Sequence, residues 1–252
     1  MSGIYGMAGL TIFVAAILSI TMLNSFTHSD HRFYWLVCAG FPLSLIVNRL
    51  VKVPLINGIG ALAGIPLQLG QQMPVWFIVM IWLSAPIFEE AIKAVLLAIP
   101  SCHVFLREST KALWAGLALG IGFGMGEAAY LAYGIAQSPA YNQFPWYAFT
   151  GFAFERFAIT FGHGLLTSIV VLGFHYGGKR AVIGYLAAVG LHALINLGPI
   201  LLVLKIIPAN MASLGTYATL LVAFVLFQKN LQAVRKNSES KNDPGEKVYF
   251  ER

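Results

Sequence analysis

A set of ionisable and amide side chains lies inside the most apolar stretches of this 252-residue chain. A charged side chain at bilayer depth costs about 2.5–3.5 kcal/mol on insertion scales, so such residues face a bundle interior or a wet cavity and pair with one another. Carboxylate, imidazole and amide groups also serve acid–base catalysis, metal binding and oxyanion stabilisation. We predict one buried reaction site, drawn from four hydrophobic segments, that contains Glu89, Glu90, Lys93, Glu127, Arg156, His163, His192 and Asn196.

Two adjacent carboxylates and a lysine occur in the segment WLSAPIFEEAIKAVLL. Glu89 and Glu90 are about 100° apart around a helix, and Lys93 lies one turn beyond both. Lys93 can therefore hold one carboxylate ionised while the other faces a cavity. Two neighbouring carboxylates in a low dielectric resist ionising together, which is how a general acid or base is made. A structural ion pair that locks helices together is the alternative interpretation.

Four of the six glycines in the next segment, WAGLALGIGFGMGEAAYLAYG, are spaced in two pairs. Gly116 and Gly120, and then Gly122 and Gly126, have the small-xxx-small spacing that lets membrane helices approach closely. We favour packing over phosphate binding, because no strand precedes these glycines. Glu127 follows them, and we expect it to pair with a basic residue of the next span; a role as a metal ligand, or as a carboxylate behind a ligand, stays open.

The following span carries a polar stripe within FERFAITFGHGLLTS. Arg156, Thr160, His163 and Thr167 are spaced by four, three and four residues, so they share one face of a helix. Arg156 is the expected partner of Glu127 in the preceding span. Glu155 lies off the stripe. A lone histidine is usually a core residue, but one that shares a face with arginine and two threonines is more typical of a site.

His192 and Asn196 lie one helical turn apart in the segment GLHALINLGP, so they point to one place. Histidine supplies a base, a metal ligand or a donor, and asparagine supplies an amide donor of the kind that oxyanion holes use. The alternative is a pair of interhelical hydrogen bonds, worth about 0.6 kcal/mol each in membranes. That gain hardly covers the burial of two polar groups, which favours a functional role.

The elements that must position these residues are membrane helices. The chain is 58% hydrophobic and 10% charged, with mean hydropathy +0.75, whereas a soluble domain carries about 25% charged residues. A span needs about 20 apolar residues. We therefore predict an all-α, polytopic transmembrane helix bundle of seven to eight spans. The clear spans are Ile4–Asn24, Phe33–Val51, Val75–Ile99, Ala112–Ala136, Tyr147–Phe174, Ala181–Leu204 and Ala209–Phe227.

The domain boundaries follow from these spans. Residues 1–228 are expected to form the bundle, with the reaction site within residues 75–204, and residues 229–252 a disordered cytoplasmic tail. The Gly- and Pro-bearing stretch Val53–Gln72 is re-entrant, interfacial or a short eighth helix. No loop is long enough for a second domain.

Basic residues in the loops predict the orientation. The loops Ser101–Lys111 and Gly173–Arg180 and the tail are basic, whereas the loop Gln137–Trp146 has no charge. These basic segments are expected in the cytoplasm. Seven spans would then place the N-terminus outside, and eight would place it inside. The net charge of +6 reflects these juxtamembrane residues, so nucleic acid is not an expected partner.

Four motifs in one order carry a family resemblance: EExxK, GFGxGExxY, an arginine followed by GHGLLTS, and HxxxN. They cover roughly Ala85–Pro199 and resemble the glutamic-type intramembrane proteases, most closely the PrsW-like and YhfC-like branches. The CAAX prenyl endopeptidases and the bacterial CPBP proteins are more distant relatives of that superfamily. The resemblance implies an endopeptidase of the lipid bilayer whose substrate is a membrane protein or a lipidated peptide.

The resemblance also implies roles for individual residues. Glu89 would activate water beside Glu90, with Lys93 in the family's basic position. His163 would help hold or deprotonate that water, and the family's second histidine and asparagine, here His192 and Asn196, would bind the oxyanion.

Three other interpretations stay open. The same chemistry can run on a divalent metal such as zinc, held by Glu89, His163 and His192; otherwise no cofactor is expected. A transporter could line a proton path with these groups, although no internal repeat is visible. A catalytically silent scaffold is the third possibility, because the Aph subunit of γ-secretase resembles this fold. We expect a multi-pass protein of a prokaryotic plasma membrane.

Overall fold

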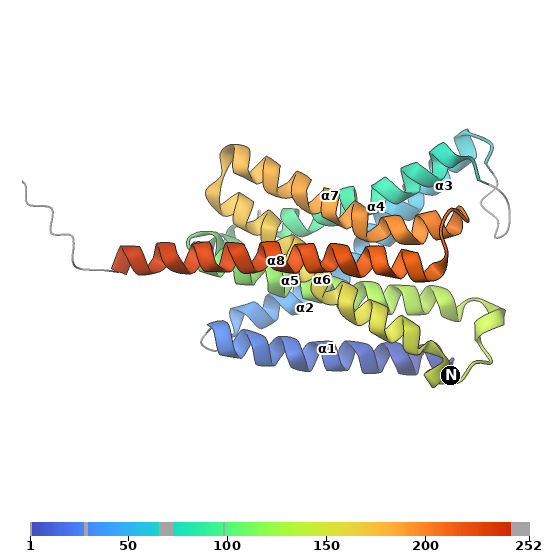
Figure 1. Cartoon of the computed structure of the whole chain (residues 1–252), viewed down its shortest axis with the longest axis horizontal. Coiled ribbons are helices and arrows are strands. Elements are labelled where there is room, and N and C mark those ends of the chain that lie inside the picture. Colours follow the sequence, from blue (N-terminus) through green and yellow to red (C-terminus); the bar gives the residue numbers. More distant parts are fainter. Residues whose placement is uncertain (1, 28–29, 66–72, 98, 243–252) are drawn as a thin grey trace, which may run out of the picture.

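The chain folds as a bundle of helices without a strand among the residues that the computed structural model describes, which are 2–27, 30–65, 73–97 and 99–242 (Figure 1). For residues 238–242 only the backbone is described. The long helices lie roughly along one direction, as in a membrane bundle. The α helices are α1 (Gly3–Thr27), α2 (Arg32–Ile46), α3 (Val53–Leu62), α4 (Val75–Leu97), α5 (Ser109–Ala136), α6 (Thr150–Tyr176), α7 (Gly178–Val203) and α8 (Ala209–Asn242).

Within the described residues, seven helical segments are long and apolar enough to cross a membrane. The prediction of an all-α, polytopic bundle is thereby confirmed, and the protein is an integral membrane protein. α2 and α3 together make one segment, Arg32–Leu62, because the π-helical turn η1 (Val47–Lys52) joins them without a break. Val53–Leu62 thus extends the second span and is no separate crossing; residues 66–72 of the uncertain stretch lie outside the described part.

α5 is the central helix, and its glycines let two neighbours approach closely. A Cβ added at Gly120 would lie 2.3 Å from the carbonyl oxygen of His163 on α6, and one added at Gly122 would lie 2.0 Å from that of Val37 on α2. The other two glycines of the pattern make similar contacts with the same two helices. The predicted packing role of this pattern is therefore confirmed.

The expected end of the last helix at Phe227 was wrong. α8 continues to Asn242, so the disordered tail that we expected from residue 229 does not begin there. Leu231 and Val234 are buried against the same core cluster as Phe227, and the lysine, glutamine, alanine and arginine residues around them are good helix formers. The helix therefore continues beyond its most apolar part because one face still packs against the core. Residues 243–252 lie outside the described part.

The connections gather at two opposite ends of the bundle (Figure 1). The α4–α5 connection, the α6–α7 connection and the end of α8 lie at one end, on the left of the view. The N-terminus and the α5–α6 and α7–α8 connections lie at the other. The three basic segments predicted to share one side of the membrane therefore share one end of the molecule.

Candidate functional site

Ionisable side chains from four spans and from the π-helical turn η1 meet in the middle of the bundle. Five of them, Glu89, Glu90, Lys93, His163 and His192, are at most 3% exposed. Each predicted site residue except Asn196 makes at least one of the hydrogen bonds described below. The cluster also includes one residue that the sequence analysis did not assign to it, a lysine of η1. Its full membership is Lys52 (η1), Glu89, Glu90 and Lys93 (α4), Glu127 (α5), Arg156 and His163 (α6), and His192 (α7).

Each carboxylate of the α4 pair has its own lysine. Lys93 donates to Glu90 Oε1 at 2.7 Å, as the one-turn spacing predicted. Lys52 donates to Glu89 Oε1 at 2.6 Å. The sequence did not predict Lys52 as a site residue. A lysine with apolar residues on both sides was the available signal, and π-helical turns are frequent at functional sites.

His192 lies between the two carboxylates of α4. Its Nδ1 donates to Glu90 Oε1 at 2.9 Å, because an ionised carboxylate can only accept. The other ring nitrogen, Nε2, therefore keeps its lone pair and lies 3.8 Å from Glu89 Oε2, beyond hydrogen-bond distance. Glu89 Oε2 is itself buried and has no hydrogen-bond partner in the described part of the chain. Two acceptors thus face each other with no donor between them.

His163 is held from both sides. Its Nε2 lies 3.1 Å from Glu127 Oε2 and its Nδ1 lies 3.4 Å from Lys93 Nζ. The same oxygen of Glu127 accepts from Arg156 Nη1 at 3.2 Å, and Arg156 Nη2 donates to Glu155 Oε1 at 2.7 Å. The predicted Glu127–Arg156 pair is confirmed, and Glu155 joins it. His163 has a neighbour for each ring nitrogen, so its orientation is fixed.

Three of the polar residues predicted near the site stay outside this network. Thr160 donates to the Arg156 carbonyl on its own helix at 2.7 Å. The hydroxyl of Thr167 is buried without a partner among the described residues. Asn196 is half-buried, and none of the hydrogen bonds found within the described residues involves its amide. The i, i+4 spacing aligned Asn196 with His192 on α7 but did not bring it into the cluster.

The charges of the cluster nearly balance. Three buried or partly buried carboxylates (Glu89, Glu90, Glu127) face three cations (Lys52, Lys93, Arg156). Glu155 adds a fourth, more exposed carboxylate on Arg156, so the group carries one net negative charge when both histidines are neutral.

Three potential metal-ligand atoms, one each from Glu89, His163 and His192, lie within 4.8 Å of one another. Ligands of tetrahedral zinc at about 2.0–2.1 Å lie roughly 3.4 Å apart, whereas acceptors or donors around a water at about 2.8 Å lie roughly 4.6 Å apart. His163 would also have to leave Glu127 or Lys93 to bind an ion. The Glu89 Oε2–His192 Nε2 separation of 3.8 Å lies between these two spacings, so either occupant requires a small shift of these side chains.

Two aromatic side chains fasten α7 to α4. Tyr185 donates to the carbonyl of Ile87 at 2.8 Å, and Trp82 Nε1 donates to the carbonyl of Ala193 at 2.9 Å. The two bonds flank His192 along α7 and hold it against the carboxylates of α4. Neither residue was predicted from the sequence, where a polar group on an aromatic ring inside a span was the only signal.

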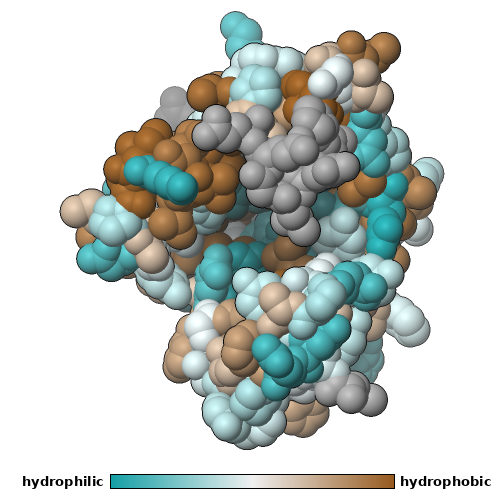
Figure 2. All heavy atoms as spheres, turned by 90° about the vertical axis from the view of Figure 1, so that its right-hand side faces the viewer, coloured by the Kyte–Doolittle hydropathy of each residue, from teal (hydrophilic) through white to brown (hydrophobic). Residues whose placement is uncertain are grey.

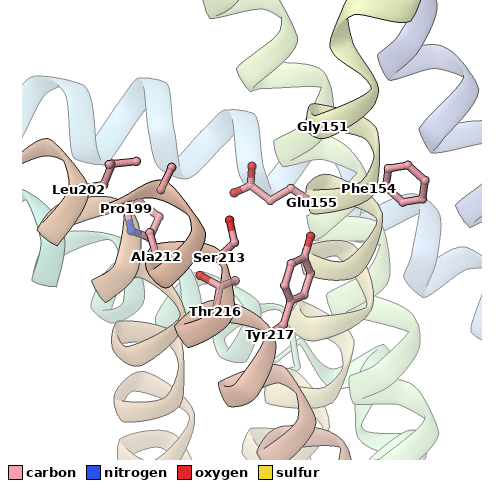
Figure 3. A pocket seen from close by; sticks show the side chains of 10 residues that line it. Gly151, Phe154, Glu155, Pro199, Leu202, Ala212, Ser213, Thr216 and Tyr217 are labelled. Atoms are coloured by element: carbon pink, nitrogen blue, oxygen red, sulfur yellow. The ribbon is translucent and has the colours of Figure 1, made fainter. Parts of the chain in front are cut away.

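A cavity of about 440 Å³ opens between α6, α7 and α8. In Figure 3 the carboxylate of Glu155 and the hydroxyls of Ser213 and Tyr217 are directed into it. Glu155, which lines this cavity, forms an ion pair with Arg156 of the cluster. The end of the bundle that carries the N-terminus is also hollowed, with hydrophilic side chains around the hollow (Figure 2). Polar groups therefore extend from the site toward this end.

No protein-family model, curated protein or solved structure matches the chain. The chemistry is therefore inferred from the geometry of the cluster. Two acceptors aimed at one point, each held by a charged neighbour, can bind a water through both of its hydrogens and take a proton from it.

Proposed function

We propose that the protein is an intramembrane endopeptidase that hydrolyses a peptide bond of a membrane protein or a lipidated peptide. The observation that carries the proposal is the pair of acceptors Glu89 Oε2 and His192 Nε2, 3.8 Å apart and nearly inaccessible to solvent. A water that donates one hydrogen to each presents its lone pair away from both. Such a water is oriented and activated for attack on a carbonyl.

In this mechanism the water attacks the scissile carbonyl while His192 or Glu89 takes its proton. Protonated His192 is stabilised by Glu90 at Nδ1, and it then returns the proton to the leaving nitrogen. Lys52 and Lys93 hold the two carboxylates ionised and in place. No covalent intermediate forms, and general acid–base help of this kind contributes about 10²–10⁴-fold.

The roles differ in part from those that the family resemblance implies. His192 acts as a proton acceptor, because its Nδ1 proton faces Glu90 and its Nε2 is free. His163 becomes a positioning residue, since Glu127 and Lys93 flank its ring nitrogens. Asn196 keeps the proposed role of oxyanion donor, one turn from His192 and with an amide that no described residue occupies.

A silent scaffold accounts less well for the buried acceptors. A buried polar atom without a partner costs about 1–3 kcal/mol, and buried ion pairs can often be replaced by apolar residues without loss of stability. Glu89 Oε2 and Glu90 Oε2 both lack a hydrogen-bond partner within the described residues, and a structural role alone would not require either oxygen to stay unsatisfied. The proposed setting is a prokaryotic plasma membrane with the basic loops in the cytoplasm.

The test uses purified protein in liposomes with a mixture of single-span membrane peptides. We expect Glu89→Gln and His192→Ala each to lower cleavage at least about 10²-fold while the protein stays folded and monodisperse. The exposed Glu108→Gln, the same chemical change at the α4–α5 connection, should cleave like wild type. Wild-type turnover in either site variant would remove that residue from the mechanism.

Metal analysis of the same preparation separates the two hydrolytic mechanisms. We expect cleavage to survive exhaustive chelation and no stoichiometric zinc. Loss of cleavage with chelator, restored by zinc, would assign Glu89, His163 and His192 as ligands instead.

A further inference from the structure

A second groove lies on the outer surface of the bundle, between α2 and α5. It encloses about 410 Å³ and is largely apolar. Gly126 forms part of its floor. Its lack of a side chain lets α2 pack closely against α5 at this point. The groove shares no residue with the cavity beside Glu155. Its lining is Phe41, Pro42, Leu45, Arg49, Gly126, Ala129, Tyr130 and Tyr133.

An arginine without a carboxylate lies at one end of this groove. The guanidinium of Arg49 is 5.3 Å from the ring centre of Tyr133 and 5.9 Å from that of Tyr130. Arg49 is exposed and forms no ion pair within the described residues. The other basic residues of the bundle interior, such as Lys52 and Arg156, each pair with a glutamate. A cation that faces lipid without a counter-charge is costly, so an anion from outside the chain is the expected partner.

The end of the groove that holds Arg49 lies near the C-terminal end of α5. Tyr133 lies three residues before the end of α5 at Ala136, which is about 5 Å along the helix axis. Tyrosine is enriched at this level, where the hydrocarbon meets the headgroups. The apolar part of the groove runs from there along α2 past Leu45 toward Phe41. One end thus offers a cation beside two tyrosine rings, and the rest offers apolar surface.

We propose that this groove binds one anionic phospholipid. The phosphate takes charge-assisted hydrogen bonds from Arg49, whose planar guanidinium suits phosphate oxygens, and the rings of Tyr130 and Tyr133 lie beside the guanidinium. One acyl chain lies along the apolar lining. Arg49 belongs to the same π-helical turn as Lys52, which reaches the buried cluster. The site does not depend on the proposed protease activity.

Native mass spectrometry of the delipidated protein tests this directly. Re-addition of phosphatidylglycerol should give one tightly bound lipid, with weaker binding of phosphatidylcholine, whose headgroup carries its own cation. Arg49→Ala should weaken phosphatidylglycerol binding about tenfold or more. Arg180→Ala is the matched control, since Arg180 lies 5.0 Å from the ring of Tyr176 but is not part of the lining of this groove; it should bind like wild type.

A second variant keeps the charge and fills the groove. Ala129→Phe retains Arg49 but occupies the space for the acyl chain, so phosphatidylglycerol should again bind at least about tenfold more weakly. Equal lipid binding in Arg49→Ala and wild type, or an equal loss in Arg180→Ala, would overturn the proposal. Inorganic phosphate that displaces the lipid at millimolar concentration would show a simple anion site instead.

Discussion

At the scale of single residues, the site is a network in which each buried charge finds its partner on another element or one turn away. Glu127 is its junction, because one oxygen accepts from both Arg156 and His163. Arg156 in turn has Glu155 as a second partner. Removal of the junction should therefore disturb more groups than removal of either neighbour.

This junction yields a prediction on stability. Glu127→Ala should cost about 3 kcal/mol of unfolding free energy, because it leaves His163 without its carboxylate and leaves Arg156 with only the more exposed Glu155. Arg156→Ala should cost somewhat less, because His163 still faces Glu127. The double variant should lose less than the sum of the two. Reversible unfolding in mixed detergent micelles measures all three, with the exposed Lys111→Ala as a control that changes little; strictly additive losses would mean that the two residues do not couple.

Contacts within one helix, or between consecutive spans, were predictable. The lysine one turn from the α4 carboxylates and the Glu127–Arg156 pair follow from spacing and from the cost of a lone buried charge. Lys52 was not predictable, because it turns inward through a π-helical turn that the 3.6-residue period does not describe. The proton position on His192 also depends on Glu90 of another helix, which no local pattern reveals.

At the scale of elements, the glycine pattern of α5 sets how closely α2 and α6 approach. Gly122→Ala would push a Cβ to 2.0 Å from the carbonyl oxygen of Val37, so we expect a loss of about 1–3 kcal/mol or more. Gly134→Ala on the same helix meets nothing within 4 Å and should be neutral or stabilise by about 0.5–1 kcal/mol. Equal effects in the unfolding assay would show that the pattern does not govern packing.

A proline in α7 depends on a hydrogen bond from α8. Pro199 has no N–H, so the carbonyl of Ile195 lacks its helical donor, and Thr216 Oγ1 donates to it at 3.0 Å. A backbone carbonyl in lipid must be satisfied inside the protein. Thr216→Val should therefore cost about 1–3 kcal/mol.

The matched variants isolate this bond. Thr219→Val removes a hydroxyl that bonds its own helix and should matter less. In a Pro199→Ala background, residue 199 regains its N–H, and Thr216→Val should then be much milder. An undiminished cost in that background would show that the carbonyl of Ile195 is not the reason for the loss.

The types and approximate bounds of the long helices were predictable from apolar length alone. The extension of α8 was not predictable, because residues 229–242 are mostly polar. Only the structure shows that Leu231 and Val234 of this segment pack against the hydrophobic core. The continuity of α2 with α3 was also missed, since Pro54 and the glycines after it resemble a loop.

At the scale of the whole molecule, the three basic segments occupy one end (Figure 1), which predicts that this end is cytoplasmic. A reporter cysteine at Lys179 tests this orientation, because the neighbouring Gly178 has φ +52, a conformation that cysteine rarely adopts. With Cys38 and Cys102 replaced, a cysteine at Lys179 should be shielded from an impermeant thiol reagent in intact cells, and one at Gln143 should be labelled. The opposite labelling would invert the topology.

The most direct test of the central claim compares new protein termini in membranes of cells that express wild type, Glu89→Gln or the exposed control Glu108→Gln. The proposed mechanism predicts fragments with termini inside or beside membrane spans that appear with wild type and with Glu108→Gln and vanish with Glu89→Gln. The uncut precursors should accumulate on the folded Glu89→Gln protein. Identical fragments in all three membranes would contradict the proposal that this buried cluster cleaves peptide bonds.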